Sequence, residues 1–414
     1  MTKKHIKKYE HRLSDGRQLI YYDDADTKLD AARKADGRRP APRPETAQMR
    51  QDPLIGDWVS VAVARQTRAF LPPAKFDPLE PQCAENPDAE IPSLYDVAVF
   101  ENKSPAFGPL LEIPTTAPPQ GLAEFGTIGL GREFTSVGRC EVVCFTPEKT
   151  GSFDTLSPSR ARTVIEAWAD RTAALSAMPN IQQVFPFENR GEVIGVTLHH
   201  PHGQIYAYPY IPPRTQALIA SLDRYDNERK TAYSPSLFAD ILQFERSSGD
   251  RVVLSGDHWT AFVPFAARWP VEVHILPHRH IADLAATSDA ERDELATFYL
   301  RVLRGIDALY EDGTPTPYIA AWHQAPVHLR RDEIRLMCQI TSPRRAVDKL
   351  KFVAGSEAAM GAWVGDVSPE LGAKRLREAI QRADAENPVG KLPEEIGGLE
   401  KSSNEKTVEL ITSN

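Results

Sequence analysis

Apolar and polar positions repeat in the same order in two parts of the chain. Residues 140–149, CEVVCFTPEK, form a strand-like run that leads into a helical pattern over residues 158–177 and then into a strand ahead of Phe187. About 130 positions later, residues 271–280, VEVHILPHRH, lead into a helical pattern over residues 289–310 and then into YIAAWHQAP and IRLMCQI. Residues 163–175 and 295–309 have the amphipathic periodicity of packed helices. The repeat predicts two similar halves that form one sheet-based fold.

Shorter patterns complete the set of expected elements. Runs rich in β-branched and aromatic residues predict strands at residues 18–22, 58–64, 193–198 and 205–211 and early in residues 96–107, while residues 213–248 and 369–385 are helix-prone. An Ala-, Arg- and Pro-rich stretch after the first strand predicts an irregular connection, and low apolar content from about residue 386 predicts a disordered tail. We therefore expect an N-terminal segment (1–50), a first half (51–215), a second half (216–385) and a tail (386–414).

Composition narrows the class of protein. The 414 residues are 41% hydrophobic and 26% charged, which is typical of a chain with a large buried core. A net charge of −8 argues against nucleic acid or an anionic membrane as the main partner. The basic start has no apolar core of a signal peptide and nothing later resembles a membrane span, so we expect a cytoplasmic protein. Four cysteines without a framework spacing fit a reducing compartment, and we predict no disulfide.

Histidine is concentrated at one place. Three of the eleven histidines fall within four positions, in the run His199-His200-Pro201-His202-Gly203-Gln204. In an extended segment, side chains two apart share a face, so His200, His202 and Gln204 are expected to converge. A neutral imidazole is a good nucleophile toward a phosphoryl group, and an uncharged amide can hold a phosphoryl oxygen. We expect Gly203 to let the backbone approach a ligand, and a backbone carbonyl near Pro201 to fix the tautomer of His202.

The residues alone leave three readings of this segment open. A His-x-His pair on a strand is a common metal site. The same cluster also occurs as a hydrogen-bonded structural feature. The third reading is a nucleotidyl-transfer site in which one histidine carries the transferred group.

The segment resembles the active-site signature of the galactose-1-phosphate uridylyltransferases, a branch of the histidine triad superfamily in which the third histidine is a glutamine. The resemblance runs from about residue 15 to about residue 379. It implies an α+β fold of two tandem histidine-triad-like halves, each an antiparallel sheet with helices. It also implies ping-pong uridylyl transfer between UDP-glucose and galactose 1-phosphate through uridylyl-His202. Another nucleotidyltransferase or dinucleoside polyphosphate phosphorylase of the superfamily, or a non-catalytic nucleotide-binding protein, stays open as an alternative.

The resemblance also assigns substrate contacts. Thr197 matches a residue that touches the phosphoryl group, and Arg65 and Arg68 match an Arg-x-x-Arg motif beside the nucleotide, where guanidinium forks suit phosphate oxygens. Asn102 and Asn189 match residues that line the uridine and ribose site, although asparagines at strand ends are also turn formers. The second-half counterpart of His202 falls at about Gln339, so we expect one active site per chain.

Residues 350–363 resemble a family segment that crosses a dimer interface and completes the nucleotide site of the partner subunit. Within it, Lys351 is expected to bring positive charge toward the phosphates and Ser356 to lie near the sugar or base. The resemblance therefore implies a homodimer with shared active sites. Without it, a lysine before an apolar pair carries no functional meaning.

The family often binds structural metals, but this chain departs from both ligand sets. At the first site the matching residues are Glu80, Cys83, Lys149 and His200, so that an ammonium stands where an imidazole is expected. We predict that Lys149 pairs with Glu80 and replaces the metal. At the second site only one of four ligands is kept, and the matching residues are Leu218, His323, Met337 and Gln339. We therefore expect no metal and no cofactor.

Overall fold

The computed structural model describes residues 5–67, 71–109, 123–125, 131–228 and 236–389. None of the helices in these ranges combines the length and the apolar character needed to cross a bilayer. The expected tail beyond residue 389 lies outside the described residues. Six α-helices are described: α1 (Pro158–Ser176), α2 (Pro213–Glu228), α3 (Leu237–Ser248), α4 (Asp289–Asp307), α5 (Gly355–Met360) and α6 (Pro369–Glu386).

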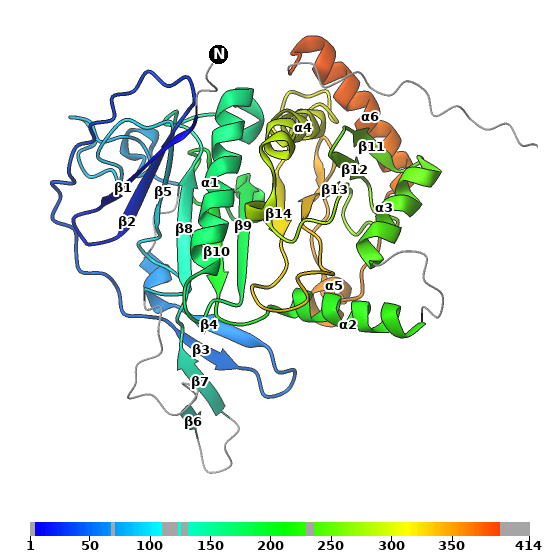
Figure 1. Cartoon of the computed structure of the whole chain (residues 1–414), viewed down its shortest axis with the longest axis horizontal. Helices are drawn as coiled ribbons and strands as arrows, with labels where there is room; N and C mark the ends of the chain where they lie inside the picture. The colour runs from blue at the N-terminus through cyan, green and yellow to red at the C-terminus, as the bar shows by residue number, and fades with distance from the viewer. Residues whose placement is uncertain (1–4, 68–70, 110–122, 126–130, 229–235, 390–414) are drawn as a thin grey trace, which may run out of the picture.

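An eleven-stranded antiparallel sheet runs through the whole molecule, in the order β1-β2-β5-β8-β10-β9-β14-β15-β13-β12-β11 (Figure 1). Its strands are β1 (Lys7–Arg12), β2 (Gln18–Asp23), β5 (Val97–Glu101), β8 (Arg139–Cys144), β9 (Gln183–Arg190), β10 (His202–Tyr208), β11 (Val252–Ser255), β12 (Trp259–Phe262), β13 (Val271–Pro277), β14 (Tyr318–His323) and β15 (Met337–Ser342). A smaller sheet holds β3 (Gln48–Gln51), β4 (Trp58–Val61), β6 (Ala123–Phe125) and β7 (Gly131–Thr135), and β16 (Arg344–Ala346) pairs with β17 (Lys349–Leu350).

The two halves predicted from the repeated pattern are confirmed. The series β8, α1, β9, β10 is followed by β13, α4, β14, β15, and the spatial order β8-β10-β9 is mirrored by β13-β15-β14. The halves join where β9 pairs with β14, which makes one continuous sheet. Both helices start in the same way, because Ser157 and Ser288 accept a hydrogen bond from the backbone three residues later.

One face of the sheet is covered by helices and the other is partly open. On the helix face, α1 and α4 contact each other, and a buried core includes Trp168, Trp259 and Trp322 (Figure 1). On the opposite face, which we call the open face, α2 and α3 cover the second half through Leu222 and Phe238. The open face of the first half is therefore left for a site beside the small sheet.

Two expected strands were wrong, and both errors have a local cause. The strand expected over residues 58–64 ends at Val61 and is followed by a 3-10 turn, Val63–Thr67. Residues 193–198 are no strand, because Gly191 and Gly195 take φ values of 103° and 86° around the short turn Glu192–Ile194. The strand β1 was not expected, since its sequence KKYEHR is polar, as suits an edge strand.

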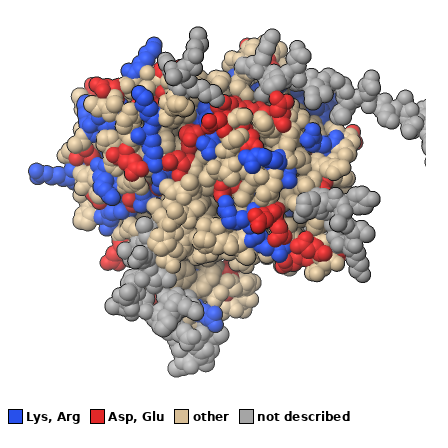
Figure 2. Space-filling model, viewed as in Figure 1, with Lys and Arg blue, Asp and Glu red and all other residues tan. Residues whose placement is uncertain are grey.

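Charges of both signs cover the surface. On the face shown in Figure 2, Lys and Arg side chains are interspersed with Asp and Glu rather than gathered in one region. Some of these charges connect the halves: Arg162 of α1 pairs with Asp293 of α4 at 2.7 Å, and Arg292 of α4 pairs with Glu166 of α1 at 2.9 Å. The mixture fits the nearly balanced counts of 49 basic and 57 acidic residues.

Candidate active site

The histidine-rich segment opens onto a cavity of about 130 Å³ on the open face of the first half. Strands β9 and β10, the loop at residues 195–197 and the turn Val63–Thr67 supply its walls. We call it the active-site cavity. Its lining residues are Arg65, Phe187, Asn189, Gly195, Val196, Thr197, His202, Gln204 and Tyr206.

The tautomer of His202 is set by a backbone carbonyl. Nδ1 of His202 lies 2.7 Å from the carbonyl oxygen of His200, and because a carbonyl only accepts, Nδ1 carries the proton and donates it. Burial lowers the pKa of His202 from its ordinary value, and the charge of His200 acts in the same direction. The ring is therefore neutral, with an unprotonated Nε2 whose lone pair is free for a nucleophilic step.

His200 belongs to the support of the site and not to its lining. Its Nδ1 lies 2.6 Å from Oδ2 of Asp77 and its Nε2 lies 2.8 Å from the carbonyl oxygen of Thr146. Asp77 and Thr146 offer acceptors, while the hydroxyl of Tyr95 lies 3.0 Å from the same Nε2 and can donate or accept, so three polar groups hold the ring. Burial acts to raise the pKa of Asp77, but the hydrogen bond and charge of His200 outweigh it and lower that pKa. The expected convergence was wrong for His200, because β10 begins only at His202.

His202 and Gln204 do share one face, as the alternation along a strand predicts. The side-chain amides of Gln204 and Asn189 have no hydrogen-bond partner in the described part of the chain, so their donors remain available in the cavity. Thr197 also lines the cavity, and its carbonyl accepts from the backbone of Leu71 at 2.9 Å. These three side chains surround the nucleophile with polar groups.

The two predicted phosphate-binding arginines differ in outcome. Arg65 lines the active-site cavity, and its Nη1 donates to the carbonyl oxygen of Ser104 at 3.3 Å. Arg68 lies outside the described residues. Asn102 is not part of the lining; its Oδ1 accepts from the backbone of Ser104 at 2.9 Å, so it shapes the turn that contacts Arg65.

The role expected for Gly203 was wrong. Gly203 faces the helix side of the sheet, where a Cβ would lie 2.8 Å from Cζ of Phe145 and 3.0 Å from the carbonyl oxygen of Phe187. The lack of a side chain therefore serves packing beneath the catalytic strand, not approach of a ligand.

The two residues expected to serve a partner subunit point into their own chain. The ammonium of Lys351 donates to the carbonyl oxygen of Arg268 at 2.9 Å and also to that of Val364. In α5, Oγ of Ser356 donates to the carbonyl oxygen of Ala362 at 2.8 Å. Neither residue lines the active-site cavity.

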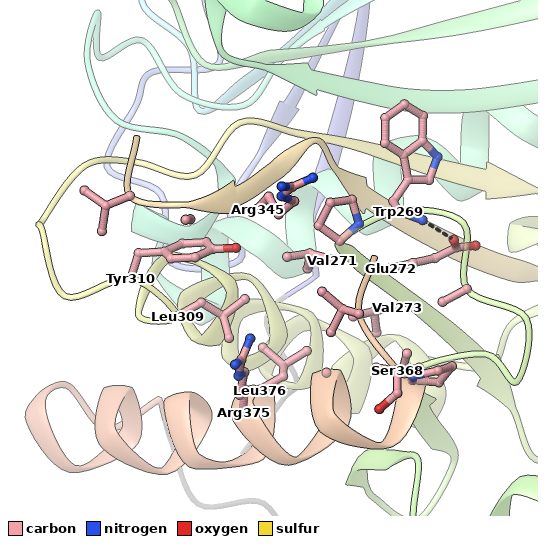
Figure 3. Close-up of a pocket in the computed structure, with 18 residues that line it drawn as sticks. Trp269, Val271, Glu272, Val273, Leu309, Tyr310, Arg345, Ser368, Arg375 and Leu376 are labelled. Carbon is pink, nitrogen blue, oxygen red and sulfur yellow. Dashed lines mark hydrogen bonds between the residues drawn. The ribbon is translucent and has the colours of Figure 1, made fainter. Parts of the chain in front are cut away.

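Larger cavities lie in the second half, away from His202. One of about 410 Å³ lies between β13 and α6, where Arg345, Tyr310 and Arg375 face an apolar floor (Figure 3). Another of about 470 Å³ lies between α2, α3 and the open face. Cavity volume therefore does not identify the active site. The site is identified by the unprotonated Nε2 of His202 and by the side-chain amides of Gln204 and Asn189, which have no hydrogen-bond partner in the described part of the chain.

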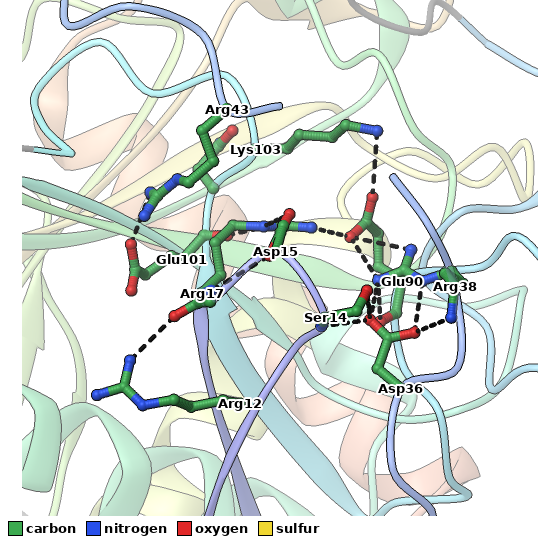
Figure 4. A network of polar contacts seen from close by, with 12 residues as sticks. Arg12, Ser14, Asp15, Arg17, Asp36, Arg38, Arg43, Glu90, Glu101 and Lys103 are labelled. Atoms are coloured by element: carbon green, nitrogen blue, oxygen red, sulfur yellow. Dashed lines mark hydrogen bonds and ion pairs between the residues drawn. The ribbon is translucent and has the colours of Figure 1, made fainter. Parts of the chain in front are cut away.

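A network of ion pairs supports the loop that carries Asp77 and Glu80. Arg17, fully buried, pairs with Asp15 at 2.7 Å and with Glu90, and Arg38 bridges from the irregular N-terminal connection to Glu90 at 3.3 Å (Figure 4). The backbone of Glu90 donates to the carbonyl oxygen of Pro78 at 2.8 Å. The network thus ties the N-terminal segment to the loop beneath His200.

The first metal position does not fit a bound cation. Lys149 forms the predicted ion pair with Glu80, and this hydrogen bond raises the pKa of Lys149 and keeps it an ammonium. Asn86 donates to the other oxygen of Glu80 at 2.6 Å, while both nitrogens of His200 are engaged. Cys83 is exposed, and its backbone exchanges hydrogen bonds with that of Asn86. A cation here would meet the ammonium of Lys149 where a ligand is needed.

The second metal position also lacks a ligand set. Leu218, His323 and Met337 line the cavity of about 470 Å³, and Gln339 lies 3.2 Å from Nε2 of His323. One imidazole among an aliphatic side chain, a thioether and an amide is too few donors for a structural metal. Within the described ranges, no group of three or more His, Cys, Asp or Glu side chains is placed to hold a metal ion.

Some residues of the site had no recognisable signal in the sequence. Tyr95 lies with its hydroxyl 3.0 Å from Nε2 of His200 and donates to the carbonyl oxygen of Leu79 at 2.8 Å. Asn86 and Phe187 also contribute, one to Glu80 and one to the cavity wall. Each is a common residue type in a common context, and only the tertiary fold brings it to the site.

Comparison with known proteins adds independent information. Residues 41–212 match the family model of the galactose-1-phosphate uridyl transferase N-terminal domain, and residues 219–384 match that of the C-terminal domain. A galactose-1-phosphate uridylyltransferase of Streptomyces lividans is 41% identical over 388 residues, which is 90% of this chain and 98% of the relative. One of Thermotoga maritima is 33% identical over 340 residues, covering 80% and 98%.

Solved structures agree on the fold. A structure described as a uridylyltransferase superposes with a TM-score of 0.69 at 28% identity, covering 81% of this chain and 99% of its own. An ADP-glucose phosphorylase of Arabidopsis thaliana superposes with a TM-score of 0.57 at 21% identity, also covering 81% and 99%. At that identity the second likeness concerns the fold alone.

Proposed function

This chain belongs to the galactose-1-phosphate uridylyltransferase family, and on that basis we propose that it transfers a uridylyl group from UDP-glucose to galactose 1-phosphate. The products are glucose 1-phosphate and UDP-galactose. The proposal rests on one observation. The unprotonated Nε2 of His202 lies in a cavity that is also lined by the side-chain amides of Gln204 and Asn189 and by the guanidinium of Arg65. That arrangement suits a covalent nucleotidyl intermediate.

The reaction has two half-reactions of the same type. Nε2 of His202 attacks the α-phosphorus of UDP-glucose, an N–P bond forms, the P–O bond to the sugar phosphate breaks, and glucose 1-phosphate leaves with the electron pair. A phosphate oxygen of galactose 1-phosphate then attacks the same phosphorus, and the N–P bond breaks as its electrons return to His202. No net proton is consumed, so the exchange needs no general acid and is reversible.

Surrounding groups stabilise the charge that moves through this exchange. While the N–P bond exists, the imidazole is cationic, and the carbonyl of His200 at Nδ1 stabilises that charge. Arg65, Thr197 and the amide of Gln204 are the donors for the phosphoryl oxygens, and Asn189 contacts the nucleoside. Arg68 and Asn102 complete the set of nucleotide-binding residues taken from the family.

Assembly, cofactors and location extend the proposal. We assign a homodimer in which residues 350–363 complete the partner's site. Lys351 and Ser356, which bond within their own chain in this structure, would turn toward the partner on dimerisation. Phe352 and Met360 in that segment are 72% and 80% exposed, which supports an interface. The Lys149–Glu80 pair and the engagement of both ring nitrogens of His200 support an enzyme that works without metal. A cytoplasmic location fits four free thiols.

Mass spectrometry of the intact protein and its peptides tests the function. After incubation with UDP-glucose alone, we expect one uridylyl adduct on His202, discharged when galactose 1-phosphate is added. His202→Ala removes the adduct, whereas the matched control His199→Ala retains it, because His199 is 61% exposed in its side chain and lies outside the lining. Nucleotide binding without an adduct would favour a non-catalytic protein. An adduct discharged only by other acceptors would favour another nucleotidyltransferase of the superfamily.

A further inference from the structure

The cavity between α2, α3 and the open face of the second half, which we call the second-half cavity, has a basic lining. Its volume of about 470 Å³ lies in the range of small-molecule sites. Arg214, Arg268 and Arg335 contribute to its wall together with His274 and His323. The described residues that line it include no Asp and no Glu. Three guanidinium groups around one cavity without a lining carboxylate are a strong excess of positive charge.

Two of these arginines, Arg214 and Arg268, are exposed, and the guanidinium of Arg268 lies 5.6 Å from the centre of the Trp363 ring. Neither the Arg214 nor the Arg268 guanidinium makes a hydrogen bond or ion pair with any residue that the structure describes. Partial removal of its guanidinium from water lowers the pKa of Arg214, the charge of Arg268 lowers it further, and the charge of Glu272 acts in the opposite direction. Like charges held close together at a cavity wall are stabilised by an anion between them.

Two buried side chains also present unpartnered polar atoms. Arg335 is 5% exposed; its Nη1 donates to the carbonyl oxygens of Pro277 and His278, but its Nε has no partner among described residues. Gln183 is 4% exposed; its Nε2 donates to the carbonyl oxygen of Gln324, whereas its Oε1 has no partner in the same ranges. A buried donor and a buried acceptor are thus left for a ligand.

Much of the remaining wall is apolar. Phe262 and Leu276 from the sheet and Phe238 from α3 belong to one buried hydrophobic cluster, and all three line the second-half cavity. The apolar body of a ligand can pack against this surface, while the cationic side chains bind its anionic group.

We propose that the second-half cavity binds a small organic anion that has one phosphate or carboxylate, an apolar body and a hydroxyl or N–H donor. The anionic group lies between Arg214 and Arg268, Arg335 Nε donates to the ligand, and Gln183 Oε1 accepts from it. The site is separate from the active-site cavity, although both use strand β9.

Isothermal titration of the full-length protein with three probes tests this assignment. Phenyl phosphate joins an aromatic ring to a phosphate, and 3-phenyllactate joins one to a carboxylate. Inorganic phosphate has no ring. We expect saturable binding of at least one aromatic probe, about tenfold or more tighter than inorganic phosphate, because only the aromatic probes use the apolar wall. The preferred aromatic probe tells a phosphate ligand from a carboxylate ligand. No saturable binding of either aromatic probe would overturn the proposal.

Variants distinguish this cavity from the active site. Arg214→Gln and, separately, Arg335→Met are expected to weaken the probe about tenfold or more, because each removes a charged donor. Arg224→Gln is the matched control on the same helix, since Arg224 is exposed like Arg214 but lies outside the lining. This variant and His202→Ala should bind the probe with unchanged affinity. Uridylyl-adduct formation is expected to persist in the two cavity variants and serves as the check that they fold. If Arg335→Met does not fold, Arg214→Gln alone decides. Binding lost in His202→Ala, or kept in Arg214→Gln, would refute the site.

Discussion

His202 and His200 are joined by a hydrogen bond of 2.7 Å from Nδ1 of the first to the backbone carbonyl oxygen of the second. The ring of His200 is in turn fixed between Asp77 and the carbonyl oxygen of Thr146. The position of the carbonyl that orients the nucleophile thus depends on the buried hydrogen bond between His200 and Asp77. Two histidines two residues apart therefore have different tasks, one in the chemistry and one in its support.

The protonation of His202 predicts how its uridylylation depends on pH. Only the neutral ring is a nucleophile, and burial lowers its pKa below the ordinary 6.5, so the neutral form persists to lower pH than in a free histidine. The rate of adduct formation from UDP-glucose, measured in single turnovers, should stay level from pH 8 to about 6.5 and fall only at lower pH. A fall centred at or above pH 6.5 would contradict the neutral, buried ring.

Replacing the amide of Gln204 tests its role as a donor to the phosphoryl oxygens. Gln204→Met keeps the length of the side chain but removes the donor, and loss of one preorganised donor costs about 10²–10³-fold in rate. We expect adduct formation to slow by that order while UDP-glucose still binds, measured by quenched-flow mass spectrometry. Gln381→Met is the matched control, because Gln381 is exposed on α6 and outside the lining, and it should lose far less. Equal losses of rate in both variants would show that Gln204 does not stabilise the transition state.

The Lys149–Glu80 pair predicts that the enzyme is indifferent to metal removal. Purified protein should contain well under one zinc or iron per chain, and EDTA should change neither its melting temperature nor its adduct formation, because an ammonium already neutralises Glu80. Elemental analysis by mass spectrometry measures the metal. The double variant Glu80→Cys with Lys149→His serves as the positive control, since it restores sulfur and nitrogen donors. A full equivalent of zinc in the unmodified protein would overturn the prediction.

The periodicity of apolar residues in the sequence predicted most of the fold. The helices expected over residues 158–177, 289–310 and 369–385 became α1, α4 and α6 within three residues at each end, because each starts with a serine cap before a regular apolar stripe. Polar edge strands such as β1 have no such stripe, and glycines at positive φ overrode the apolar run at residues 193–198.

The site was less accessible to sequence reasoning than the fold. Alternation along one strand was enough to pair His202 with Gln204, and a resemblance supplied Arg65, Asn189 and Thr197, which do line the cavity. The ring of His200 and the hydroxyl of Tyr95 meet through residues 105 positions apart in the chain. Contacts of that kind depend on tertiary packing, which local patterns do not encode.

The junction between the halves holds a carboxyl group that should make stability depend on pH. Glu188 of β9 accepts from the hydroxyl of Tyr318 of β14 at 3.0 Å, and burial raises the pKa of Glu188 to about 8. Between the ordinary value of 4.5 and about 8 the folded chain holds this proton while the unfolded chain releases it. Stability therefore falls as pH rises through this window, by up to about 1 kcal/mol per pH unit.

Glu188→Gln mimics the protonated carboxyl, keeps an acceptor for Tyr318 and removes this dependence. The variant should be more stable than the unmodified protein, and the difference should grow from pH 5 to about 8 and then level off, reaching about 3 kcal/mol or more. Urea unfolding at several pH values measures it. Glu192→Gln is the matched control, because the Glu192 side chain is 59% exposed and its ionisation costs the folded state little. A stability difference that does not change with pH would mean that Glu188 is ionised in the folded protein.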